Sequence, residues 1–239
     1  MKTHDQPGTT SLLKYTWVMF DLDDTLISRT ADIVQQANIA ALQLLSANAH
    51  DMQLLTEHLA SVYQHTTQGS GVLVSKQQQF SQLLHRLGRS EGMEQLLAAY
   101  LASYISCIHV FPDVHATFST LTAHGVHIGI ATNGPPDVVE AVLQHCDMRQ
   151  FVHCIVTPAD VGAVKPAQAF ATCVVAQTGV DPRQILFVGD RAEDIMTAKY
   201  MGATAVLVER GASVALEVKP DYIVQTLSDI LPLCLSTAS

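Results

Sequence analysis

The run Tyr15-Thr-Trp-Val-Met-Phe-Asp21-Leu-Asp-Asp-Thr25 decides the fold of this chain. Its first six residues are apolar, aromatic or β-branched, as in a strand that is buried on both faces of a parallel sheet. An acidic cluster follows directly. Asp21 and Asp23 therefore come at the carboxyl end of a buried strand, which is the edge where open α/β sheets bind their ligands.

The C-terminal half of the chain alternates between strand and helix patterns. Apolar strand patterns cover 126–132, 151–157, 185–190, 204–208 and 222–224. Amphipathic helix patterns cover 138–146, 167–178 and 193–201. Strands that alternate with helices of about 10–15 residues are typical of βαβ units, so we predict an α/β fold with a parallel sheet.

A helical segment interrupts this sheet after its first strand. From about Arg29 to Ile108 apolar residues recur at helical spacing, with breaks near 46–50, 68–71 and 88–92, and we predict four helices. The predicted core is discontinuous and consists of residues 12–27 and 109–239. Residues 28–108 form an α-helical cap, with hinges near 27–29 and 107–111 that let it close over the site. We expect residues 1–11 to be a flexible N-terminus.

The other strands also end in polar residues. Thr132-Asn133 ends the second strand, Lys165-Pro166 follows the third after a loop, and Gly189-Asp190 ends the fourth, with Asp194 four residues on. All of these ends can lie on one edge of the sheet, so we expect one shared site.

Phosphoryl transfer needs groups of these types. In this interpretation Asp21 is the nucleophile, and Asp23 is the general acid that later acts as the base. Two carboxylates this close need a cation, and Mg²⁺ prefers oxygen ligands such as those of Asp190. Thr132 offers a hydroxyl donor to the phosphate, and Lys165 offers a positive charge.

Together the segments Asp21-Leu-Asp-Asp-Thr25, Thr132-Asn133, Lys165-Pro166 and Gly189-Asp190-Arg-Ala-Glu-Asp194 resemble the four motifs of the haloacid dehalogenase (HAD) superfamily. Order and spacing agree from residue 15 to residue 230. The helical insert resembles the α-helical C1 cap of subfamily I, which includes phosphoglycolate phosphatase-like and nucleotidase-like phosphatases.

The resemblance implies a Rossmann-like core, essential magnesium and an aspartyl-phosphate intermediate. It also implies three metal ligands, namely Asp21, the main-chain carbonyl of Asp23, and Asp190. Thr132, Asn133 and Lys165 would hold the phosphate. Asp194 either touches a metal-bound water or orients its neighbours.

We therefore expect a phosphatase that hydrolyses a small phosphorylated metabolite. Phosphoglycolate, a sugar phosphate and a nucleoside monophosphate remain open as substrates. The alternatives are a phosphomutase of the same superfamily, a phospho-accepting receiver-type signalling module and a non-catalytic phosphate-binding protein. A dehalogenase needs the nucleophile but not Asp23. The basic residues of the cap either contact the far end of the substrate or lie in solvent: Arg29, Lys76, Arg86 and Arg89.

The composition limits the partners. The 239 residues are 48% hydrophobic and 15% charged, with a net charge of −9, which argues against a nucleic acid polymer. Five cysteines without a CxxC pair are typical of reduced thiols, so we expect a cytoplasmic protein. No apolar run reaches the ~18 residues of a membrane span. The sequence is compatible with a monomer or a homodimer.

Overall fold

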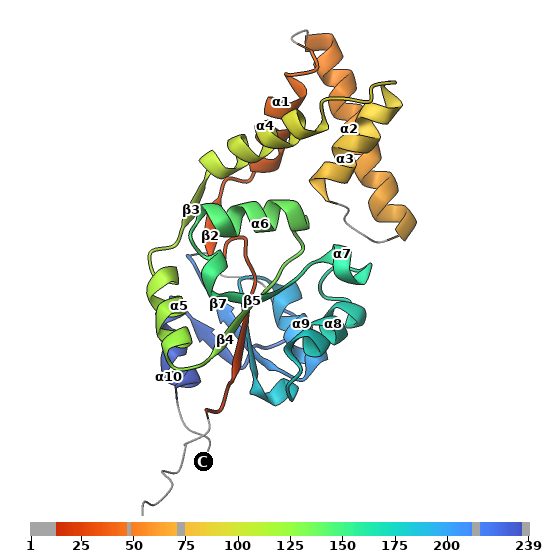
Figure 1. Ribbon diagram of the computed structural model, residues 1–239. Coiled ribbons are helices and arrows are strands. Elements are labelled where there is room, and N and C mark those ends of the chain that lie inside the picture. Colours follow the sequence, from red (N-terminus) through yellow and green to blue (C-terminus); the bar gives the residue numbers. More distant parts are fainter. Residues whose placement is uncertain (1–12, 47–48, 71–74, 212–215, 236–239) are drawn as a thin grey trace, which may run out of the picture.

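The computed structural model describes residues 13–46, 49–70, 75–211 and 216–235, except for the side chains of 49, 51 and 62–70. A six-stranded parallel sheet forms its centre, in the order β5-β4-β1-β6-β7-β8 (Figure 1). The strands are β1 (Trp17–Phe20), β4 (His127–Ala131), β5 (Val152–Val156), β6 (Ile185–Gly189), β7 (Thr204–Val208) and β8 (Tyr222–Val224). The prediction of an α/β, Rossmann-like core is confirmed. The strand order reverses at β1, and such a switch point is where doubly wound sheets bind ligands.

Both faces of β1 are buried, as its unbroken apolar pattern predicts. Val18 and Phe20 point to one apolar core, whereas Trp17 and Met19 point to another on the opposite face. Helices cover both faces of the sheet (Figure 1). The first core includes residues of α5 (Val114–Ala123), α6 (Pro136–His145) and α10 (Leu231–Cys234). The second includes residues of α8 (Gln168–Thr178) and α9 (Ala192–Met201).

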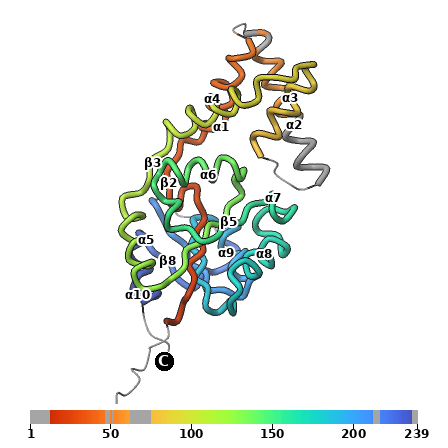
Figure 2. The backbone as a smooth tube through the Cα atoms, viewed as in Figure 1, coloured from red at the N-terminus to blue at the C-terminus, as the bar shows by residue number. Residues whose placement is uncertain are grey.

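Four helices follow one another between two short strands, β2 (Ile27–Arg29) and β3 (Ile108–Val110). They are α1 (Ile33–Leu42), α2 (Ala49–Ser70), α3 (Lys76–Arg86) and α4 (Met93–Ser106). These four helices and the three breaks between them agree with the periodicity of the sequence. In the backbone tube of Figure 2, this helical insert extends from one end of the core.

The two strands at the junction were not predicted. They pair antiparallel, with Ile27 opposite Val110, so the chain enters and leaves the helical insert at one place. This pairing supports the division that we propose, with the core at 12–27 and 109–239 and the helical insert at 28–108. The expected flexible N-terminus at 1–11 lies outside the described residues.

Several element boundaries differ from the sequence patterns by one to a few residues. Strand β1 begins at Trp17, although Tyr15 before it is also buried. Helix α5 was not assigned from sequence, and neither was the single turn α7 (Pro158–Val161). In the described part of the chain no helix has both the length and the apolar character that a membrane crossing requires.

Candidate active site

Three strands end side by side and deliver the first site residues. Asp21 follows β1, Thr132 follows β4 and Asp190 follows β6. Backbone hydrogen bonds extend the ladder one residue further: the Asp21 N–H donates to the Val188 carbonyl at 2.9 Å, and the Thr132 N–H donates to the Val156 carbonyl at 3.1 Å. The parallel register therefore fixes where these side chains begin, as the sequence analysis expected.

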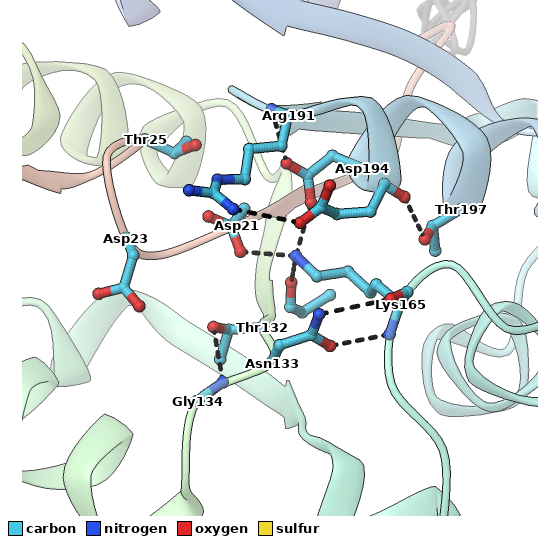
Figure 3. A network of polar contacts seen from close by, with 12 residues as sticks. Asp21, Asp23, Thr25, Thr132, Asn133, Gly134, Lys165, Arg191, Asp194 and Thr197 are labelled. Carbon is cyan, nitrogen blue, oxygen red and sulfur yellow. Dashed lines mark hydrogen bonds and ion pairs between the residues drawn. The ribbon is translucent and has the colours of Figure 1, made fainter. Parts of the chain in front are cut away.

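Lys165 lies at the centre of the resulting network, which Figure 3 shows from close by. Its Nζ donates to Oδ1 of Asp21 and Oδ1 of Asp194, both at 2.6 Å, and to the Ala131 carbonyl at 2.8 Å. All three donor positions of the ammonium are thus used. The side chains of Lys165 and Asp194 are almost completely buried, and that of Asp21 is 9% exposed. Both contacts are buried charge pairs.

Asp194 makes two of the hydrogen bonds of this network, although the sequence analysis left its role open. Besides Lys165 it accepts a hydrogen bond through Oδ2 from the backbone N–H of Arg191, at 3.0 Å, which closes the first turn of α9. Gly189 makes room for it, because a Cβ at that position would lie 2.3 Å from Cγ of Asp194. Asp194 therefore orients Lys165 directly, one of the two roles the sequence left open.

The charges at this edge do not balance. Burial raises the pKa of Asp21 well above its ordinary value; Lys165 opposes this shift, while Asp194 and Asp23 add to it. Burial alone would lower the pKa of Lys165, but Asp194 and Asp21 outweigh it and raise that pKa. Burial and the charges of Asp194 and Asp24 raise the pKa of Asp190 to about 6. The hydrogen bond from Thr25 opposes this shift. The carboxylates outnumber the one ammonium that faces them.

These carboxylates fit a divalent metal. Asp21, Asp190 and Asp194 each place an oxygen within 4.8 Å of the others. Carboxylate oxygens are the donors that hard divalent cations prefer, and a cation there would offset the surplus negative charge. The side-chain cluster contains Asp194 in addition to the two predicted side-chain ligands. The predicted ligand from Asp23 is its main-chain carbonyl, which lies outside this side-chain set.

Asp23 is separate from this network, and Figure 3 shows its carboxylate pointing away from Lys165. Oδ1 of Asp23 lies 3.2 Å from Nε of Arg29 and accepts a 3.4 Å hydrogen bond from the Tyr104 hydroxyl. The Arg29 Nε–H is not aligned with this carboxylate, so the contact with Arg29 is an ion pair without a hydrogen bond. Burial raises the pKa of Asp23, and the charge of Arg29 opposes the shift. The predicted acid thus contacts residues of the helical insert.

Thr132 and Asn133 differ in what they offer. Thr132 is buried, and its Oγ1 accepts from the Gly134 N–H at 3.2 Å, so its hydroxyl hydrogen is left to donate. Asn133 bonds to the backbone of Lys165 at both ends of its amide: Oδ1 accepts from the Lys165 N–H at 2.8 Å, and Nδ2 donates to the Lys165 carbonyl at 3.4 Å. Asn133 therefore fixes the loop that carries the lysine.

A cavity of about 510 Å³ lies between the sheet edge and the helical insert. Asp21, Asp23, Thr132, Asn133, Lys165 and Asp194 all line it, so the structure brings these predicted residues to one space. Asp190 borders the network through Thr25 and the carboxylate cluster. Of the four basic residues considered for the cap, Arg29 and Lys76 line the cavity, whereas Arg86 and Arg89 are exposed.

The insert also lines the cavity with side chains that the sequence analysis missed: Asn38, Gln79, Tyr100 and Tyr104. The sequence held one usable signal, Ser75-Lys-Gln-Gln78, which forms a capping box at the start of α3. That signal places Lys76 in the first turn of a helix but does not show which way its side chain points.

The buried carboxylates and the lysine thus lie at the switch point of a doubly wound sheet, the edge where such α/β folds bind their ligands. Residues 18–208 match the family described as haloacid dehalogenase-like hydrolase, and the chain belongs to that family. Phosphoglycolate phosphatase of Yersinia pseudotuberculosis serotype I is 28% identical over 226 residues, which cover 90% of this chain and 91% of that protein.

Solved structures agree on the fold. A HAD phosphatase from Thermococcus onnurineus superposes with a TM-score of 0.65 at 20% identity, covering 94% of this chain and 100% of that one. An L-2-haloacid dehalogenase from Xanthobacter autotrophicus, with chloropropionic acid covalently bound, superposes with a TM-score of 0.63 at 18% identity, covering 94% and 100%. The same fold therefore accompanies both phosphatase and dehalogenase names, and the site must separate them.

Proposed function

We propose that this chain is a magnesium-dependent phosphatase that hydrolyses a small phosphorylated metabolite through an aspartyl-phosphate on Asp21. One observation carries the proposal: Asp21, which lines the cavity, contacts the buried Lys165 at 2.6 Å and belongs to a cluster of three carboxylates. The phosphatase names among its relatives support it.

The first half of the reaction transfers the phosphoryl group. An oxygen of Asp21 forms a bond to phosphorus as the bond from phosphorus to the ester oxygen breaks, and Asp23 gives its proton to that departing oxygen. Lys165 holds Asp21 in place and offsets the charge on the phosphoryl oxygens, while the Thr132 hydroxyl donates to one of them.

The second half regenerates the enzyme. Asp23, now ionised, takes a proton from water, whose oxygen attacks phosphorus; the bond from phosphorus to Asp21 breaks and inorganic phosphate leaves. Asp21, Asp190 and the Asp23 carbonyl, with Asp194 beside them, would hold the Mg²⁺. That ion would supply positive charge that lets a phosphate approach three carboxylates.

Asp23 separates this proposal from a dehalogenase. A departing halide needs no proton, whereas a departing alkoxide does, and Asp23 lines the cavity where that proton is needed. A phosphomutase would use the same residues, so the fate of the phosphoryl group decides between the two: a phosphatase releases it as free phosphate without a bisphosphate intermediate.

The test is phosphate release from a panel of phosphoglycolate, sugar phosphates and nucleoside monophosphates, with Mg²⁺ and with EDTA. We expect turnover that EDTA abolishes, and a loss of at least roughly 10³-fold in Asp21→Asn. Asp24→Asn is the matched control: it removes the same charge nearby, at a φ of 60° that Asn tolerates, and should retain activity. Turnover that survives Asp21→Asn would refute the proposal.

A further inference from the structure

A second buried lysine faces the same cavity from the helical insert. Lys76 begins α3 and is only 4% exposed. Its Nζ donates to Oε1 of Gln79 at 2.8 Å and to Oδ1 of Asn38 at 3.3 Å. Both acceptors are neutral amides, and none of the ion pairs among the described residues includes Lys76. A buried ammonium with only neutral acceptors is unusual, since buried charges are normally paired.

One candidate partner for the Lys76 ammonium, the carboxylate of Asp137, is bound to backbone N–H groups instead. Asp137 of α6 accepts from the backbone N–H groups of Lys76 at 3.0 Å and Gln77 at 2.8 Å, so it binds the N-terminus of α3. These two hydrogen bonds join the insert to the core and fix the position of the Lys76 backbone. The ammonium itself is left directed at amide oxygens and at the face of Tyr100, whose ring centroid lies 4.6 Å from Nζ.

The polar groups in this part of the cavity favour an anion. Because the oxygen of Asn38 accepts from Lys76, the polar group that Asn38 has left is its NH₂, which only donates. Among the described residues of the insert, two cations line the cavity, Arg29 and Lys76, and no aspartate or glutamate does. Arg29 pairs with Asp23, so of these two cations Lys76 is the one that forms no ion pair with a described residue.

The positive charge of Lys76 lies apart from the place where the scissile phosphate would bind Asp21. The Tyr104 hydroxyl contacts Asp23, the ring of Tyr104 stacks on Tyr100 with centroids 5.9 Å apart, and Tyr100 faces Lys76. Two stacked rings, one helical turn apart on α4, therefore lie between the acid and Lys76. A ligand group that reaches Lys76 is a different group from the phosphate at Asp21. Apolar side chains such as Leu59 and Val142 line the same cavity.

We infer that Lys76 selects substrates of the proposed phosphatase that carry a second anionic group at the end remote from the scissile phosphate. The inference rests on the proposed function and adds a specificity residue to it. The anionic group is a carboxylate or a second phosphate, joined to the first phosphate by a short carbon chain that passes the tyrosines.

The test compares chain-matched substrates. Steady-state phosphate release is measured with Mg²⁺ on butyl phosphate, 4-phosphooxybutanoate and butane-1,4-diyl bisphosphate. We expect the wild type to favour an anionic substrate over butyl phosphate by roughly 10- to 100-fold in kcat/KM, the factor that a charge-assisted hydrogen bond supplies. Whichever of the two anionic substrates gains more identifies the source of the charge. In Lys76→Met the ratio falls towards one, through KM of the anionic substrate.

Two further variants complete the test. Arg89→Met, a change of an exposed cation just after α3, should keep the wild-type ratio. Asn38→Asp places a carboxylate against Lys76 and should lower the ratio while the lysine stays, which also covers a failure of Lys76→Met to fold. A wild type that hydrolyses all three substrates alike, or an unchanged ratio in Lys76→Met and Asn38→Asp, overturns the inference and leaves the phosphatase intact. If no substrate of the full panel releases phosphate, both the inference on Lys76 and the proposed phosphatase function are refuted.

Discussion

Replacing Lys165 by methionine should destabilise the protein far more than the same change at Lys199. Lys165 and Lys199 each place Nζ 2.6 Å from a carboxylate oxygen, on Asp21 and Asp221 respectively. They differ in burial: the Lys165 side chain is 2% exposed and the Lys199 side chain 33%. The pair of variants therefore holds the residue type and the distance constant and changes the environment.

The expected magnitude follows from what methionine leaves behind. Lys165→Met strands two buried carboxylates, those of Asp21 and Asp194, and the Ala131 carbonyl. Removing one partner of a buried pair costs about 3–5 kcal/mol, whereas an exposed pair contributes about 0–1 kcal/mol. Protonation of the stranded carboxylates partly relieves the loss, so we expect about 3–5 kcal/mol in total for Lys165→Met.

Urea unfolding in metal-free buffer at pH 7 measures the difference, since a domain with about 5–15 kcal/mol of stability still folds after such a loss. The reasoning is refuted if the free energies of unfolding of Lys165→Met and Lys199→Met agree within about 1 kcal/mol. Such a result would mean that the buried ammonium is not held by the carboxylates around it.

Two more outcomes follow from the geometry. Gly189→Ala would place a Cβ 2.3 Å from Asp194, so we expect lower activity and a melting temperature several degrees lower; unchanged values for both would contradict the close approach. Burial lowers the pKa of Lys76 to about 8 against the pull of Asp137, so between about pH 8 and its unfolded value near 10.4 the unfolded chain binds a proton that the folded chain does not. The free energy of unfolding of the wild type, minus that of Lys76→Met, should then rise with pH across that window, by up to about 3 kcal/mol, and a flat difference would contradict it.

The strand-end residues could be predicted because the sheet itself positions them. In a parallel sheet every strand presents its carboxyl end at one edge, so Asp21, Thr132 and Asp190 could be expected at the same edge. They meet because β4, β1 and β6 are neighbours in the sheet. The contact between Asp194 and Lys165 needed more, since it depends on Gly189 as well as on the loop that Asn133 holds. The sequence left two roles open for Asp194, and the structure places it both against Lys165 and within the carboxylate cluster.

The sequence predicted four helices in the insert and offered its basic residues as possible substrate contacts, but it did not show which polar side chains line the cavity. Helical periodicity indicates which side of a helix is apolar, yet in this insert polar side chains also face inward. Gln79 contacts Lys76 within α3, whereas Asn38 reaches it from α1, and a periodic pattern does not show which helices face each other. The junction strands β2 and β3 were missed because each has three residues, too few for an alternating pattern.

The two buried lysines show where sequence reasoning ends and packing takes over. Both are almost fully buried and line one cavity, so burial acts on both in the same direction. Lys165 lies against Asp21 and Asp194, and its pKa is raised. Lys76 lies against neutral amides, and its pKa is lowered to about 8. The fold thus places carboxylates against Lys165 but neutral amides against Lys76. The ammonium of Lys76 therefore gains most when a ligand brings a negative charge to it.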